Sequence, residues 1–302
     1  MAIAEQPAAG RVARPRFSAG GVFRTVRHYG IIPGIPLFVL VTLIFVGAFA
    51  PLISPHEPNK QSLLDSNVAP AWTAEGTSNN LLGTDRFGRD QLTRIFYGAR
   101  ISLIVSFVTI AIGGAIGTLV GLTAGYFGGW LDSLLMRIVD VFLAFPGLLL
   151  AIVLATVFEP SFTIVILVAS LLIWPRFARL VRGDTLGIKP NDFVTYARIT
   201  GTPTPRILMK HIFPNVIPTL LVLCTWEVGA IILLESSLSF LGAGIPPPNP
   251  SWGTMVLDGR GQLEEGWWIS LFPGLAIMTT VLSLNLLGDW MRDYLDPKLR
   301  HA

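Results

Sequence analysis

The sequence predicts an all-α integral membrane protein with six transmembrane helices and both termini in the cytoplasm. Only 14% of its 302 residues are charged, against roughly 25% in an average soluble domain. The charges are also bunched, since four stretches contain no lysine, arginine, aspartate or glutamate: 31–54, 101–131, 141–158 and 266–288. Each stretch is at least as long as the roughly 18 residues that indicate a membrane span.

Six apolar segments are the predicted spans, in the order 32–53, 101–125, 138–158, 161–181, 216–241 and 268–289. The first is longer than the apolar core of a cleaved signal peptide, so we expect it to be retained. Only Glu159-Pro160-Ser161 separates the third and fourth segments, which predicts a tight turn. The fifth contains two glutamates and is assigned from the apolar runs on either side of them.

The basic residues predict the orientation. With the N-terminus inside, sixteen of the 22 lysine and arginine residues fall on the cytoplasmic side, as membrane proteins prefer. Seven of them surround one inner loop, 182–215. The chain then divides into a basic and disordered cytoplasmic tail at 1–30, a first helix with an outer loop at 31–98, a five-helix core at 99–292 and a cytoplasmic C-terminal tail at 293–302.

Composition and missing motifs exclude several classes of protein. The net charge of +3 is too small to indicate nucleic-acid binding. Cys224 is the single cysteine, so no disulfide forms within one chain. The sequence contains neither GxxxxGK[ST] nor HExxH, and its four histidines are scattered. We therefore expect no catalytic residues, no metal site and no cofactor in this chain.

Glycines recur every four residues in the second span, at Gly113, Gly117, Gly121 and Gly125. This spacing aligns them on one ridge of a helix, where a neighbouring helix can approach closely. We expect helix packing to be their role. The alternative is a part in gating or in lining the path of a substrate.

Three acids, Asp140, Glu227 and Glu235, fall within or near predicted spans. An unpaired charge there costs a few kcal/mol, and such residues usually face a bundle interior or a cavity. Two roles remain open, namely a place in a translocation pathway or an internal ion pair, for example between Asp140 and Arg137.

The inner loop carries a predicted short helix from Asp192 to Gly201, with the acid near its start and the glycine at its end. Phe193, Tyr196, Ala197 and Thr200 are predicted to share one face of it. A second segment follows Pro205 and runs to Asn215. The helix either rests on the membrane surface or docks a cytosolic partner.

At this loop the chain resembles the permease subunits of ATP-binding-cassette importers, whose cytoplasmic motif reads EAA, three residues, Gly, nine residues, then IxLP. Thr195-Tyr196-Ala197 takes the place of EAA, Gly201 that of the glycine, and His211 to Pro214 that of the tail. Thr195 thus stands where the motif has glutamate, and Tyr196 where it has its first alanine.

Other segments resemble the second permease subunit of the dipeptide, oligopeptide and nickel uptake systems. They include LGTDRFGRD at 82–90, GARISL at 98–103, GYFGGWLD at 125–132, SSLSFLGAG at 236–244, PSWG at 250–253 and LDP at 295–297. The charges of segment 83–90 either hold the outer loop together through local ion pairs and turns or contact another protein.

The resemblance implies the fold of a type I importer permease in the bacterial cytoplasmic (inner) membrane. It also implies four partners: a homologous permease subunit, two cytosolic ATPases that bind ATP and magnesium, and an extracytoplasmic solute-binding protein. The ATPase-coupling residues would be Asp192, Thr195, Tyr196, Ala197, Gly201, His211 and Pro214. The implied substrates are dipeptides or oligopeptides, with nickel or glutathione as the alternative.

Two rival functions belong to other classes. A stand-alone secondary transporter predicts inverted repeats and broken midplane helices, and the two halves of the chain show no convincing repeat. An intramembrane enzyme predicts a convergent nucleophile and base. Serines occur in the spans, but no histidine accompanies them.

Overall fold

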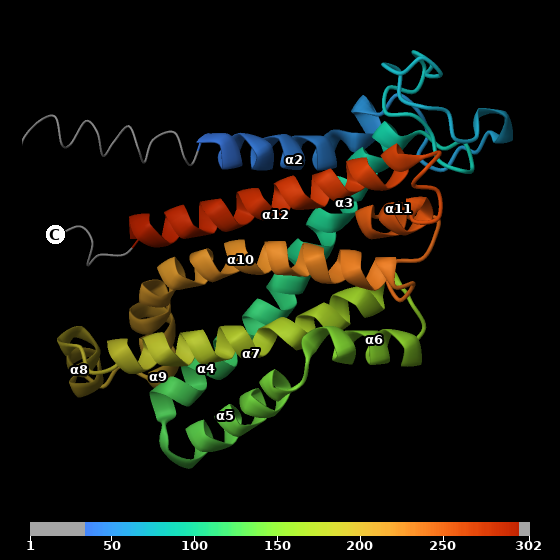
Figure 1. The fold of residues 1–302 in the computed structure, drawn as a ribbon. Helices are drawn as coiled ribbons and strands as arrows, with labels where there is room; N and C mark the ends of the chain where they lie inside the picture. Colours follow the sequence, from blue (N-terminus) through green and yellow to red (C-terminus); the bar gives the residue numbers. More distant parts are fainter. Residues whose placement is uncertain (1–33, 296–302) are drawn as a thin grey trace, which may run out of the picture.

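A computed structural model describes residues 34–295 of the chain, and this part folds into a bundle of helices (Figure 1). The predicted tail at 1–30 lies outside the described residues, as do the last seven residues of the C-terminal tail. In chain order the helices are α2 (Gly34–Ile53), α3 (Gln91–Thr109), α4 (Ala115–Phe127), α5 (Gly129–Ala144), α6 (Gly147–Val157), α7 (Phe162–Ile188), α8 (Asp192–Ile199), α9 (Thr204–Ile207), α10 (Phe213–Phe240), α11 (Trp252–Gly259) and α12 (Trp267–Leu295).

Within the described residues, five helices are long and apolar enough to cross a membrane. They are 34–53, 91–127, 162–188, 204–240 and 267–295. Two of these contain π-helical turns, at Ile110–Gly114 between α3 and α4 and at Leu208–Ile212 between α9 and α10. The inner segment that begins at Pro205 is therefore continuous with the fifth span instead of forming a separate element.

The third predicted span, 138–158, differs from the straight helix that its apolar run indicates. Two helices, α5 and α6, meet there at an angle of 85°. The cause is Pro146, because the residue before a proline avoids helical geometry. Phe145 is accordingly extended, with φ −80° and ψ 138°. α5 and α6 form a sixth span only if the bent pair is taken as one span. α5 begins at Gly129, nine residues earlier than the predicted span.

The glycine ridge of the second span lies directly against α7. A Cβ atom added to Gly117 would sit 2.3 Å from the carbonyl oxygen of Trp174, and one added to Gly121 would sit 2.6 Å from that of Ala178. For Gly113 and Gly125 the nearest backbone oxygens of α7 would lie 2.9 and 3.1 Å away. The backbones of the two helices thus touch along about three turns, which only residues without a side chain permit.

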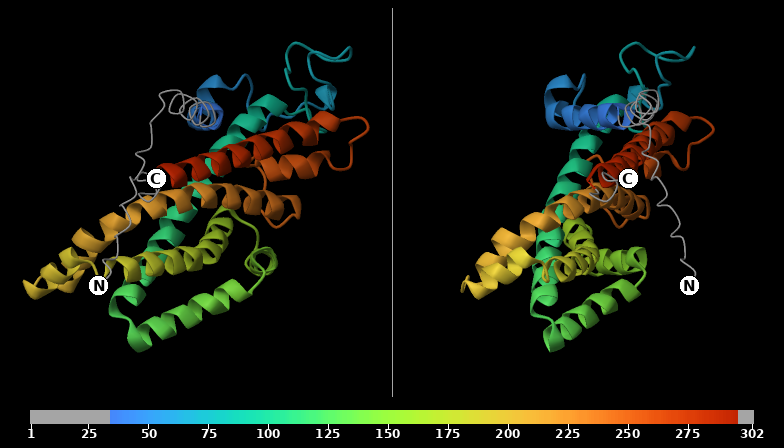
Figure 2. Two further views of the ribbon diagram at one scale, coloured as in Figure 1. Left: turned by 60° about the vertical axis from the view of Figure 1, so that its left-hand side comes forward. Right: turned by 90° about the vertical axis from the view of Figure 1, so that its left-hand side faces the viewer.

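α2, α12 and α10 form a layer of neighbouring helices, α11 packs against α10 and α12, and α3 crosses this layer (Figures 1 and 2). Its core centres on Trp252 of α11, which packs with Leu40, Ile232, Met255 and Leu284. The outer loops and α11 gather at one end of the bundle, and α8 and α9 lie at the other end (Figure 1). The segments that the basic residues predict to be outer and inner thus lie at opposite ends of the bundle.

Candidate functional site

The short inner helix forms as predicted, and its last turn shows why the sequence ends it there. Gly201 has φ +74°, a left-handed conformation that glycine adopts without strain. The amide of Gly201 donates to the carbonyl of Arg198, and the amide of Thr202 donates to that of Ala197. These two bonds form a Schellman motif, which satisfies carbonyls at the end of α8.

One face of α8 is buried and the other is left open. Val194 and Ala197 are buried, whereas Phe193, Tyr196 and Ile199 are exposed. The predicted shared face of Phe193, Tyr196, Ala197 and Thr200 is therefore wrong for Ala197, which points into the chain. The spacing of the three exposed residues, i, i+3 and i+6, gives α8 an uncovered apolar stripe at the inner end of the bundle.

The buried face of α8 connects it to the inner ends of three long helices. One cluster joins Val194 and Ala197 to Leu122 and Tyr126 of α4, Val181 of α7 and Ile207, Ile212 and Val216 around the start of α10. The guanidinium of Arg198 and the ammonium of Lys189 each lie 5.8 Å from the ring centre of Tyr126. α8 is thus packed against α4, α7 and the start of α10.

The other residues of the predicted coupling motif lie around this cluster. Asp192 and Thr195 are exposed on α8, His211 is half-buried, and Pro214 is exposed in the first turn of α10. These four motif residues therefore lie at the surface of the inner end, and the buried residues of the cluster pack α8 against the long helices.

A ladder of three arginines runs down α7 toward this inner end. Arg176 pairs with Glu227 of α10, with Nη1 to Oε2 at 3.1 Å. Arg179 forms an ion pair with Asp140 of α5. Arg182 donates two hydrogen bonds of 2.6 Å to the carboxylate of Asp132, also in α5. Asp140 is thus paired across helices with Arg179, and the suggested pair with Arg137 is wrong.

Sequence reasoning missed this ladder because it used the three arginines only to orient the chain. The signal was present, since residues 176, 179 and 182 are three apart in a mainly apolar helix, a spacing that places them on one face. Their acids come from two other helices, so the sequence alone gives no pairing.

A cavity of about 340 Å³ opens beside Arg176, between α5, α6, α7 and α10. Arg176 and Glu227 line it, together with mainly apolar side chains that include Phe145 and Leu234. Just below, the side chains of Arg179 and Asp140 are both more than half exposed. Charges at membrane depth require water or protein around them, so this face of the chain is suited to a polar pathway or a partner subunit and not to lipid.

Glu235 lies apart from this cavity. It is almost completely buried near the outer end of α10 and accepts a hydrogen bond of 2.7 Å from Ser239. The structure therefore brings Asp140 and Glu227 to one face and leaves Glu235 in the core. Across residues 34–295, no three histidine, cysteine, aspartate or glutamate side chains gather to hold a metal ion.

The sequence matches one protein family over residues 117–301, described as the binding-protein-dependent transport system inner membrane component. A dipeptide transport system permease protein of Haemophilus influenzae is 39% identical over 274 residues, which cover 91% of this chain and 92% of that protein. A glutathione transport system permease protein of Pectobacterium atrosepticum is 40% identical over 275 residues, covering 91% and 88%.

The fold is also similar to that of a solved transporter. A chain of the MetNI methionine ABC transporter in an inward-facing conformation superimposes with a TM-score of 0.54 over 68% of this chain and 95% of that one, at 17% identity. The predicted permease architecture is therefore supported independently of sequence similarity.

Proposed function

Because the chain belongs to the family of binding-protein-dependent transport system inner membrane components, we propose that it is one permease subunit of an ATP-driven importer of short peptides. A homologous permease completes the membrane unit. Two cytosolic ATPases hold ATP and magnesium, and an extracytoplasmic binding protein delivers the solute. The chain itself performs no catalysis, in keeping with the absence of a phosphate-binding loop from its sequence.

The uncovered apolar stripe of α8 carries the coupling part of the proposal. Phe193, Tyr196 and Ile199 expose hydrophobic surface at the inner end of the bundle, which is the kind of surface that a partner protein can cover. In the proposed mechanism the ATPases bind this stripe and move α8 when they close on ATP. The hydrophobic cluster behind α8 then transmits the movement to α4, α7 and α10.

The cavity at Arg176 and Glu227 is the proposed inner part of the pathway. Short peptides carry an ammonium at one end and a carboxylate at the other. An arginine and a glutamate whose ion pair can open present the complementary charges in an apolar surround, where charge interactions are strong. Movement of α7 against α10 would open this pair for the peptide and close it afterwards.

Uptake by purified components tests the function. Proteoliposomes that contain this chain with its permease partner and ATPases are expected to accumulate a radiolabelled dipeptide only when ATP and the binding protein are both supplied. Glutathione and nickel ions serve as competing solutes. Preferential ATP-dependent accumulation of either would move the substrate assignment to that solute, and accumulation driven by an ion gradient without the ATPases would overturn the proposal.

Replacing Gly201 by valine is expected to lower uptake roughly tenfold while the chain stays in the membrane. A β-branched residue at φ +74° costs about 1–2 kcal/mol, which frays the end of α8. Gly201→Asn is the matched control, because asparagine tolerates this conformation. The ratio of uptake to ATP hydrolysis in proteoliposomes checks the effect. Equal ratios for the valine and asparagine variants would contradict a coupling role for the helix end.

A further inference from the structure

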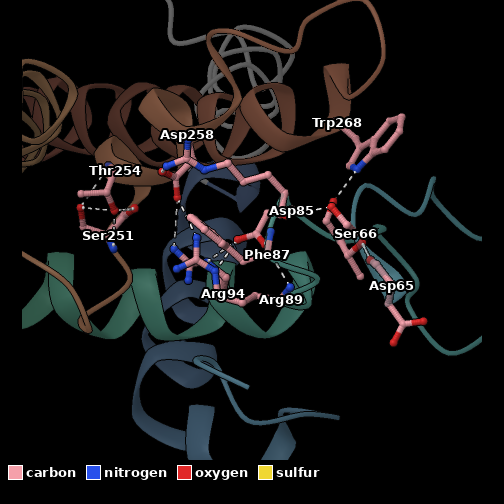
Figure 3. A network of polar contacts seen from close by, with 12 residues as sticks. Asp65, Ser66, Asp85, Phe87, Arg89, Arg94, Ser251, Thr254, Asp258 and Trp268 are labelled. Carbon is pink, nitrogen blue, oxygen red and sulfur yellow. Dashed lines mark hydrogen bonds and ion pairs between the residues drawn. The ribbon is translucent and has the colours of Figure 1, made fainter. Parts of the chain in front are cut away.

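Five charged side chains form a network near the outer end of the bundle and join the two outer loops. Figure 3 shows Asp85, Arg89, Arg94 and Asp258 of this network. Arg89 donates from Nε to Asp85 at 2.6 Å and from Nη2 to Asp258 of α11 at 2.9 Å. Arg86 reaches the same Asp258 carboxylate at 3.4 Å. The charges of segment 83–90 therefore do hold the outer loops together, and they also leave one group unsatisfied.

That group is the guanidinium of Arg94, at the start of α3. Only 3% of the residue is exposed. Its Nε lies 3.8 Å from Asp85 and its Nη2 lies 3.7 Å from Asp258, both too far for hydrogen bonds. Nε and Nη1 are buried and have no hydrogen-bond partner. A buried charged donor without a partner costs free energy, and a carboxylate close to the guanidinium would offset part of that cost.

The charges of the network do not balance. Three arginines, Arg86, Arg89 and Arg94, face two aspartates, Asp85 and Asp258. One positive charge is left over. A single additional carboxylate would balance the charge of the network.

A cavity of about 450 Å³ adjoins this network. The three arginines and Asp258 form one wall, and the proline-rich loop 246–249 forms another. Arg86 is half exposed and marks the solvent side of the cavity, whereas Arg94 is buried. Apolar residues such as Phe87 and Ile245 also line it, and an apolar surround strengthens the attraction between an arginine and a carboxylate.

We propose that this outer cavity receives one acidic side chain of the extracytoplasmic binding protein, whose carboxylate pairs with Arg94. The inference rests on the proposed function, which supplies that partner. The cavity is separate from the one at Glu227, because the two share no lining residue. Glu227 itself lies twelve residues, or roughly 18 Å, from Ser239 along α10. The walls of the outer cavity are also fixed by ion pairs between the two outer loops, which suits a docking contact better than a peptide in passage.

Binding of the purified binding protein to the reconstituted complex tests the inference. Arg94→Gln is expected to weaken binding about tenfold or more, chiefly through faster dissociation, and Arg94→Lys is expected to weaken it less. Arg86→Gln is expected to change mainly the association rate and its dependence on salt. Arg260→Gln is the matched control, because Arg260 lies two residues from Asp258 but contacts the Phe240 ring outside the network. The complex with this variant is expected to bind the binding protein as the wild type does.

The outcomes separate this inference from the function on which it rests. If the wild-type complex binds no binding protein, both fail. If the wild-type complex binds the binding protein and both Arg94 variants bind it as tightly as the wild type does, only the docking site is wrong. A normal dissociation constant with a raised KM for peptides that have a free C-terminal carboxylate, but not for peptide amides, would assign the cavity to the substrate. If the Arg94→Gln complex does not assemble, the affinities of the Arg94→Lys and Arg86→Gln complexes for the binding protein test the site instead. Wild-type affinity and association rate in both would contradict it.

Discussion

Replacing Glu227 by glutamine is expected to abolish most uptake, by a factor of ten or more, and to lower the amount of chain in the membrane. The substitution leaves Arg176 without its carboxylate at membrane depth. Removing one partner of a buried ion pair lowers the stability by about 3–5 kcal/mol. Because Arg176 is half exposed, solvent screens its charge and the loss is expected near the lower value. Immunoblotting of membranes and uptake of a labelled dipeptide measure the two effects separately.

The double variant Arg176→Gln/Glu227→Gln separates a pathway role from a structural one. Removing both charges is expected to restore the amount of chain, since no unpaired charge remains, but not the uptake. Full uptake by this variant would show that the pair serves stability alone. Arg182→Gln/Asp132→Asn is the matched control, because that pair also joins α7 to another helix but lies outside the cavity. We expect it to keep its uptake.

Replacing Gly117 by leucine is expected to leave no assembled chain in the membrane. Even the Cβ atom would lie 2.3 Å from a backbone oxygen of α7 and 2.5 Å from Phe177 Cβ, so the two helices must separate. Gly117→Ala tests the same contact more mildly and is expected to destabilise the chain by about 1–3 kcal/mol, as overpacking does. Thermal unfolding of the purified complex in detergent measures the difference.

Gly183→Ala is the matched control for the glycine ridge. Gly183 lies within helix α7, and a Cβ atom added there meets nothing within 4 Å in the described chain. Alanine is the better helix former by up to about 1 kcal/mol, so this variant is expected to melt at the wild-type temperature or slightly above it. A melting temperature for Gly117→Ala equal to that of Gly183→Ala would contradict the close approach of α4 and α7.

The sequence predicts the membrane fold well because the signals for it are local. Long apolar runs, the placement of basic residues and the four-residue glycine spacing depend on neighbouring positions only. The largest difference in shape, the 85° bend between α5 and α6, also had a local signal in Phe145-Pro146. Hydropathy outweighed it in the prediction, since an apolar run shows how long a segment is and not whether it is straight.

The charged sites could be predicted only in part, because their partners are distant in sequence. Asp140 and Glu227 were identified as unusual for their position, but their arginines lie 39 and 51 residues away. Arg94 and Asp258 are farther apart still, and their contact depends on the packing of α11 against α3. Only the folded chain shows that the arginines outnumber the acids in the outer network.

The most direct test of the central claim, that separate ATPases drive this chain through α8, is the number of peptides imported per ATP hydrolysed in proteoliposomes. Tyr196→Asp places a charge in the centre of the exposed apolar stripe without touching the buried face of α8. We predict a ratio that falls at least about tenfold, with the complex still present in the membrane. An unchanged ratio, or ATP-independent accumulation by the wild-type complex, would contradict the account.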